Sequence, residues 1–100
     1  MVKHIVMWKL LAYVDGKSLE ENREEMKIRL EGLKERIPEI LALEVGINYN
    51  GSGDAYDIVL YSEFQDKAAQ DTYQDHPAHV EAKGFIQKVR SAKRVVDYEI

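Results

Sequence analysis

The chain has 100 residues, enough for one domain with one hydrophobic core, so we expect a single domain over residues 1–100. Apolar residues make up 45% and charged residues 32%, a composition typical of a folded globular domain rather than of a disordered segment. The net charge of −4 argues against a nucleic-acid partner, and no apolar run is long enough for a membrane span. Without cysteine or an export signal, the sequence predicts a cytoplasmic protein that has no disulfides.

The first half of the chain predicts a strand, a turn, a helix and a second strand. Residues 2–11 alternate as a strand does, and one face carries Val2, His4, Val6, Trp8 and Leu10. A turn over residues 14–17 precedes Ser18, which begins a helix with Glu21 in the capping-box position. The helix carries an apolar stripe, and Pro38 ends it. Residues 42–49 alternate again and predict the second strand.

The second half predicts a hairpin, a third strand, two helical segments and a last strand. The hairpin covers residues 48–54 and the strand residues 56–64. Asp66 caps a helix that carries Tyr73, and helical spacing resumes after Pro77 through Val89. Residues 94–100 form the last strand. The basic residues between 88 and 94 fall near the predicted helix end, where the helix dipole favours cations.

The order β-α-β-β-α-β predicts an α+β, ferredoxin-like fold with two helices on one face of a four-stranded antiparallel sheet. Two of the predicted strands, residues 2–11 and 56–64, are apolar on both faces. A sheet of this kind would expose a larger apolar patch than monomers normally tolerate. We therefore expect a homodimer in which the two sheets face each other across a two-fold axis.

Residues 73–80, with the sequence Tyr-Gln-Asp-His-Pro-Ala-His-Val, hold two of the three histidines and a tyrosine. A neutral imidazole can remove a proton near pH 7, and a phenol can donate a hydrogen bond to a carbonyl that becomes an enolate. On an unbroken helix Tyr73 and His79 would point about 120° apart, but Pro77 interrupts the helix and leaves both free to turn into one cavity. An ordinary structural role is the alternative, with His76 as a cap, Tyr73 in the core and His79 a hydrogen-bonded imidazole.

The residues 2–9, 56–64, 73–80 and 95–98 together resemble the stress-responsive α/β-barrel domain family, also called Dabb proteins. The resemblance covers essentially the whole chain and implies a dimeric α/β barrel. In a plant polyketide cyclase of this family, which performs an intramolecular aldol condensation, the matching tyrosine and histidine are catalytic. The resemblance therefore implies catalytic roles for Tyr73 and His79. Ile58 and Leu30 stand where that cyclase has a histidine and a tyrosine, which argues against the same substrate.

The resemblance and the inward-facing residues together predict which side chains line or fill a ligand pocket. They are His4, Trp8, Leu30, Ile58, His76 and Phe85. Two functions stay open from the sequence. The first is a non-catalytic, stress-associated dimer that binds a small apolar or carbonyl ligand. The second is a cyclase or lyase with His79 as general base and Tyr73 as hydrogen-bond donor.

Other chemistries have weaker support in the sequence. A haem- or metal-dependent monooxygenase is suggested only by other dimeric α+β barrels. A metal site made by His4, His76 and His79 has no carboxylate to complete it. We expect neither a metal nor a cofactor, and as partners only a second copy of the chain and a small molecule, with no nucleic acid and no membrane.

Overall fold

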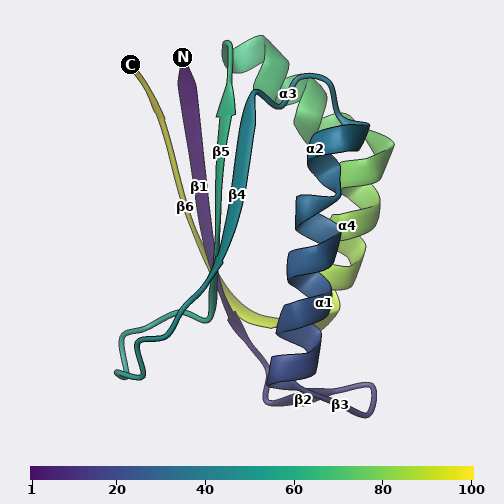
Figure 1. The fold of residues 1–100 in the computed structure, drawn as a ribbon, viewed down its shortest axis with the longest axis vertical. Helices are drawn as coiled ribbons and strands as arrows, with labels where there is room; N and C mark the ends of the chain where they lie inside the picture. The colour runs from purple at the N-terminus through teal and green to yellow at the C-terminus, as the bar shows by residue number, and fades with distance from the viewer.

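The computed structural model describes all 100 residues and shows a four-stranded antiparallel sheet with helices on one face (Figure 1). The strands lie in the order β4-β5-β1-β6, where β1 is Val2–Leu10, β4 Ala42–Ile47, β5 Ile58–Phe64 and β6 Arg90–Glu99. The helices are α1 (Leu19–Glu31), α2 (Leu33–Arg36), α3 (Lys67–Asp75) and α4 (Pro77–Val89). The fold is therefore α+β and ferredoxin-like, as the sequence predicts.

The start of α1 is determined locally. The short strands β2 (Tyr13–Val14) and β3 (Lys17–Ser18) form a small hairpin whose turn residues Asp15 and Gly16 have φ of 53° and 77°. Two such positive values are what a two-residue hairpin turn requires. Ser18 then forms the predicted capping box: its hydroxyl accepts from the Glu21 amide at 3.2 Å, and its own amide donates to the Glu21 carboxylate at 3.0 Å.

Several boundaries differ from the sequence prediction. The predicted single helix is interrupted at Gly32, between α1 and α2, and it ends at Ile37, whose backbone is extended as expected before a proline. The first strand ends at Leu10 and the second at Ile47. The third strand begins at Ile58 rather than at Tyr56, because Asp57 is bound to the end of β1 instead. Its amide donates to the Trp8 carbonyl at 2.8 Å, and its carboxylate accepts from the Leu10 amide at 2.7 Å.

The last strand is longer than predicted. It begins at Arg90 rather than at Arg94, because β6 pairs with β1 from Leu10 opposite Arg90 to Val2 opposite Glu99, with one register shift between Lys9 and Leu10. The basic residues near the predicted helix end therefore do not all belong to the helix. Only Lys88 lies in the last turn of α4, whereas Arg90 caps the helix and Lys93 lies in β6.

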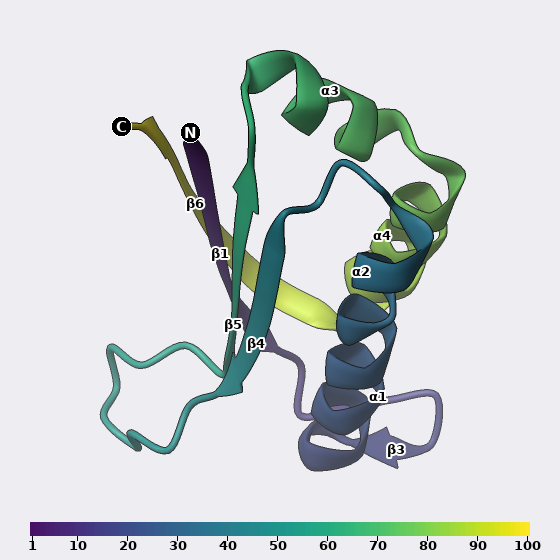
Figure 2. The same ribbon diagram turned by 45° about the horizontal axis from the view of Figure 1, so that its top comes forward.

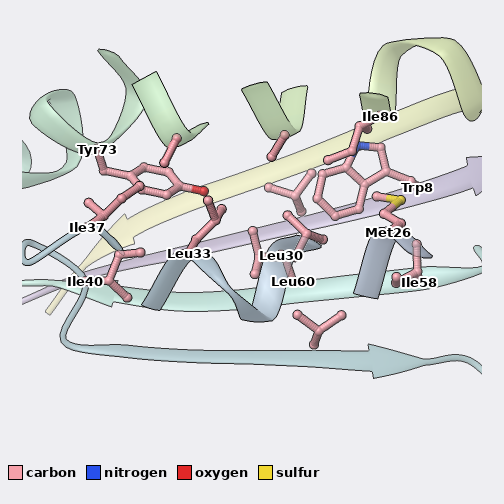
Figure 3. Close-up of a cluster of buried hydrophobic side chains, with 14 of the residues drawn as sticks. Trp8, Met26, Leu30, Leu33, Ile37, Ile40, Ile58, Leu60, Tyr73 and Ile86 are labelled. Carbon is pink, nitrogen blue, oxygen red and sulfur yellow. The ribbon is translucent and has the colours of Figure 1, made fainter. Parts of the chain in front are cut away.

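The core fills the space between the sheet and the helices (Figure 3). On β1 the predicted inward face is buried in full, from Val2 to Leu10. The opposite face of the sheet carries no helix (Figures 1 and 2). None of the helices has the length and apolar character needed to cross a membrane.

Candidate active site

His4 lies on the inward face of β1, opposite Asp97 of β6 in the antiparallel register. The imidazole is 5% exposed, and its Nδ1 contacts the Asp97 carboxylate. The side-chain amide of Gln70 lies 3.3 Å from the same nitrogen, but the charged carboxylate is the closer partner. Because a carboxylate only accepts hydrogen bonds, the Nδ1 of His4 carries a proton and donates it to Asp97.

Tyr73 lies on α3 and is 1% exposed. Its ring packs against those of Phe64, with centroids 4.8 Å apart, and of His79, with centroids 4.5 Å apart. The His4 ring is edge-on at 6.0 Å. Burial raises the pKa of the Tyr73 phenol well above its usual range, and the nearby negative charge of Asp97 adds to the effect. The phenol is therefore neutral and acts as a hydrogen-bond donor at any physiological pH.

The Tyr73 hydroxyl has no hydrogen-bond partner in the protein, although every fully buried side-chain nitrogen and oxygen has one. The small exposed area of Tyr73 therefore includes the hydroxyl oxygen. Figure 3 shows the ring at one end of the buried cluster, with its oxygen directed into the space between helices and sheet. A donor held in this way is available to a ligand.

Pro77 determines how His79 is held. In a continuous helix the Gln74 carbonyl would accept from the Ala78 amide, but that amide donates instead to the His76 side chain at 3.0 Å. His76 thus caps α4 with Pro77 in the first turn, which was the structural role predicted for it. The Gln74 carbonyl, left free by this cap, lies 3.1 Å from Nδ1 of His79. Since a carbonyl only accepts, Nδ1 of His79 is the protonated nitrogen and Nε2 is the basic one.

The charge state of His79 follows from its surroundings. Partial burial lowers the pKa of the imidazole, the Gln74 hydrogen bond opposes that effect, and the positive charge of Lys83 lowers the pKa further. His4 and Lys93 act in the same direction as Lys83. The imidazole is therefore neutral near pH 7, with a free lone pair on Nε2.

These groups meet in a cavity of about 130 Å³ between α3, α4 and the inner face of the sheet. The volume is similar to that of a ~150 Å³ engineered cavity that binds benzene. Four of the polar groups that line the cavity lie close together: His4, Tyr73, His79 and Asp97. The apolar walls are formed by Val6, Trp8, Leu30, Leu60, Ala82, Ile86 and Val95, and the remaining lining residues are Gln74, Lys83, Gln87, Arg90 and Lys93.

The structure places three of the six predicted pocket residues, His4, Trp8 and Leu30, in this cavity together with Tyr73 and His79. The other three lie elsewhere. Ile58 is fully buried beside a separate hollow next to the β4–β5 connection. Phe85 is partly buried against the core outside this cavity, and the Arg29 guanidinium stacks on its ring at 4.4 Å.

His76 lies outside the cavity because it caps α4. It therefore does not join His4 and His79, and the structure contains no group of three or more His, Cys, Asp or Glu side chains able to hold a metal.

Sequence reasoning missed Asp97, Lys83, Arg90 and Lys93 as cavity residues. Asp97 and Lys93 stand on β6 opposite His4 and Trp8, so a correct antiparallel register of the first and last strands would have found both. Lys83 and Arg90 are spaced four and eleven residues after His79, and helical periodicity alone places all three near one face of α4.

A ferredoxin-like domain with a partly polar cavity between helices and sheet is the class that this geometry defines. The chain belongs to the family described as the stress responsive A/B barrel domain, whose model matches residues 2–100. Among curated proteins none matches it significantly.

Solved structures with the same fold include a dimeric protein of unknown function from Bacteroides fragilis. It is 36% identical, the match covers 99% of this chain and 95% of that one, and the TM-score is 0.84. An Arabidopsis thaliana protein, At3g17210, is 27% identical with coverage of 100% and 95% and a TM-score of 0.82. A hydroxynitrile lyase from Passiflora edulis is 18% identical with coverage of 99% and 92% and a TM-score of 0.81, a likeness of fold alone.

Proposed function

We propose that this protein is an acid–base enzyme that removes a proton next to a carbonyl group, in an aldol-type cyclisation or a lyase reaction. The observation that carries the proposal is the open cavity lined by Tyr73, whose hydroxyl has no partner in the protein, and by His79, whose ring packs against the Tyr73 ring. A purely structural tyrosine would bond its hydroxyl to the protein, and a filled core would leave no cavity. Of the two functions open from the sequence, the geometry favours the catalytic one.

The residues suffice for both halves of such a reaction. Nε2 of neutral His79 takes the proton from the carbon next to the carbonyl, and the electron pair of that C–H bond becomes the enolate double bond. The carbonyl oxygen gains negative charge and accepts a hydrogen bond from the Tyr73 hydroxyl. The enolate carbon then attacks a second carbonyl carbon, and the imidazolium returns its proton to the new alkoxide. The reverse sequence is a lyase reaction.

Support from the fold is of a general kind. A hydroxynitrile lyase is built on the same architecture, so the architecture can accommodate lyase chemistry. The His4–Asp97 pair lines the same cavity, and the His4 ring meets the Tyr73 ring edge-on at 6.0 Å between centroids. We assign this pair a positioning role, because Asp97 fixes the orientation of the imidazole.

Exchange of substrate protons with solvent tests the first chemical step directly. In D₂O the protein should accelerate deuterium incorporation into the methyl group of acetophenone, followed by NMR. His79→Gln should abolish the acceleration, and Tyr73→Phe should reduce it by a factor of about 10². Lys34→Met is the control, because Lys34 is exposed on α2 and lies outside the cavity. Saturable ketone binding without any exchange would leave a binding protein and refute the catalytic assignment.

We also propose that the domain is a homodimer joined through the bare sheet face. This face carries Ile5, Met7, Val59, Tyr61, Val96 and Tyr98, and Val96 and Tyr98 are 54% and 43% exposed. The charge of Lys3 on this face is neutralised internally, because Lys3 donates to Tyr61 at 2.8 Å and pairs with Glu63 at 3.4 Å. The relative from Bacteroides fragilis is described as dimeric.

A charge at the centre of this face tests the dimer. Ile5→Asp should convert the protein to a monomer in size-exclusion chromatography with light scattering. Ile28→Asp is the control, since Ile28 is 58% exposed on α1. A wild-type protein that is monomeric at micromolar concentration refutes the proposal.

A further inference from the structure

Three basic side chains converge on the cavity. Lys83 comes from the middle of α4, Arg90 from its C-cap and Lys93 from β6. None of the three has a carboxylate within ion-pair distance. The chain as a whole is acidic, with 18 acidic and 14 basic side chains, so this concentration of unpaired cations is opposite to the overall charge.

The helix dipole does not explain this arrangement. A dipole favours cations in the last turn of a helix, whereas Lys83 lies near the middle of α4 and Lys93 lies in a strand. The one carboxylate in the cavity, Asp97, is already bound to His4. The cations also repel one another: burial lowers the pKa of Lys93, Arg90 and Lys83 lower it further, and the negative charge of Asp97 offsets only part of this effect. A bound anion would remove this repulsion.

A second unused donor lies at the same end of the cavity. Trp8 stands opposite Lys93 in the β1–β6 register. Its indole N–H has no partner in the protein, so by the argument applied to Tyr73 the nitrogen is not fully buried, and Trp8 is one of the residues that line the cavity. Figure 3 shows the indole nitrogen turned toward Ile86 of α4, at the end of the cluster away from Tyr73.

We propose that the ligand is a carboxylate whose reacting carbonyl lies a short apolar segment away from the acid group. Lys83, Arg90 and Lys93, with the Trp8 indole N–H, hold the carboxylate at the open end. The apolar segment lies against Leu30 and Ile86, and the carbonyl reaches Tyr73 and His79. The inference deepens the proposed function, since it names the substrate class of the same cavity. An aryl ring is the right size for a cavity of about 130 Å³.

A pair of isosteric probes tests the charge. 4-Acetylbenzoate and 4-acetylbenzamide have nearly the same shape, and only the first is an anion. Calorimetry at low ionic strength should show the benzoate binding at least about tenfold more tightly, since hydrogen bonds to charged groups are the stronger ones. The preference should shrink in 0.5 M NaCl, because the site is open to solvent.

Variants of the cavity lysines test whether these residues cause the preference for the benzoate. Lys93→Met and Lys83→Met should each reduce the preference for the benzoate several-fold, while Lys34→Met, an exposed lysine on α2, should leave it unchanged. Equal affinity for the two probes, or a preference that survives in both cavity variants, overturns the inference. Competition by inorganic phosphate as strong as by unsubstituted benzoate would overturn the assignment to carboxylates.

Deuterium exchange of the acetyl methyl group separates this inference from the proposed function. Exchange in both probes without a charge preference refutes the carboxylate site and leaves the catalytic role intact. Lysine-dependent binding of the benzoate without exchange refutes catalysis and supports the carboxylate site. If neither probe binds at millimolar concentration, the carboxylate site and the catalytic role are both refuted.

Discussion

Replacement of Tyr73 by phenylalanine separates the structural from the chemical contribution of this side chain. The ring is 1% exposed and contacts Phe64 and His79, whereas the hydroxyl has no partner in the protein. Tyr73→Phe keeps the ring and loses no hydrogen bond. We therefore expect the free energy of unfolding to change by less than about 0.5 kcal/mol, whereas a hydroxyl bonded to the protein would cost roughly 0.5–1.5 kcal/mol.

Tyr73→Ala gives the matching upper limit. It removes the ring from a packed site and leaves a cavity, so the expected loss is about 3–5 kcal/mol. This is a large share of the ~5–15 kcal/mol that a domain of this size has in total. The difference between the free energies of unfolding of the two variants therefore separates the contribution of the ring, which packs in the core, from that of the hydroxyl, which is free for a ligand.

Urea denaturation is a suitable assay, because the single tryptophan, Trp8, is buried and reports unfolding by fluorescence. All variants need the same protein concentration, since stability depends on concentration if the protein dimerises. A loss of 1 kcal/mol or more in Tyr73→Phe would show that the hydroxyl is bonded within the fold. The assignment of this group to the cavity would then be wrong.

Three further variants test other parts of the structure by the same assay. Asp97→Ala should cost about 1–3 kcal/mol, because it leaves the Nδ1 proton of buried His4 without its acceptor; an unchanged midpoint would contradict the pair. His79 has a lowered pKa in the folded state, so the unfolded chain binds its proton more readily and wild-type stability should fall as the pH drops through 6.5. His79→Gln should show a smaller fall between about pH 7.5 and 5.5, and equal slopes would contradict the shift. Ser18→Ala should cost about 1 kcal/mol through the capping box and leave ligand binding intact.

The sequence predicts the elements well where local chemistry decides them. The capping box at Ser18, the Asp66 cap and the break at Pro77 are each specified within a few residues, and the structure contains all three. Alternation along residues 2–10 correctly separates the buried face from the open one. The early start of β6 could not be found in this way. Residues 90–93 are mostly polar, and only their pairing with β1 makes them a strand.

The candidate site is predictable in part for the same reason. Periodicity shows that Trp8, Leu30 and Ile58 all face inward, and all three are buried. It does not show which of them share a space, because that depends on their height along the sheet and on where the helices cross it. Asp97 and Lys93 cannot be predicted as cavity residues from the local sequence, because only the β1–β6 register places them there.

The cavity stays open because the helix layer does not cover the whole sheet. β4, β5 and β1 have buried inward residues, but no residue of β6 is buried, and Val95 is 46% exposed although it faces the helix side opposite Val6. Apolar residues at positions 87, 90 and 93 would close this edge and stabilise the core by burial. The chain has Gln87, Arg90 and Lys93 there instead. These polar residues and the unpartnered Tyr73 hydroxyl make one edge of the core less stable than apolar residues would. This pattern is expected where a fold maintains a site for a ligand.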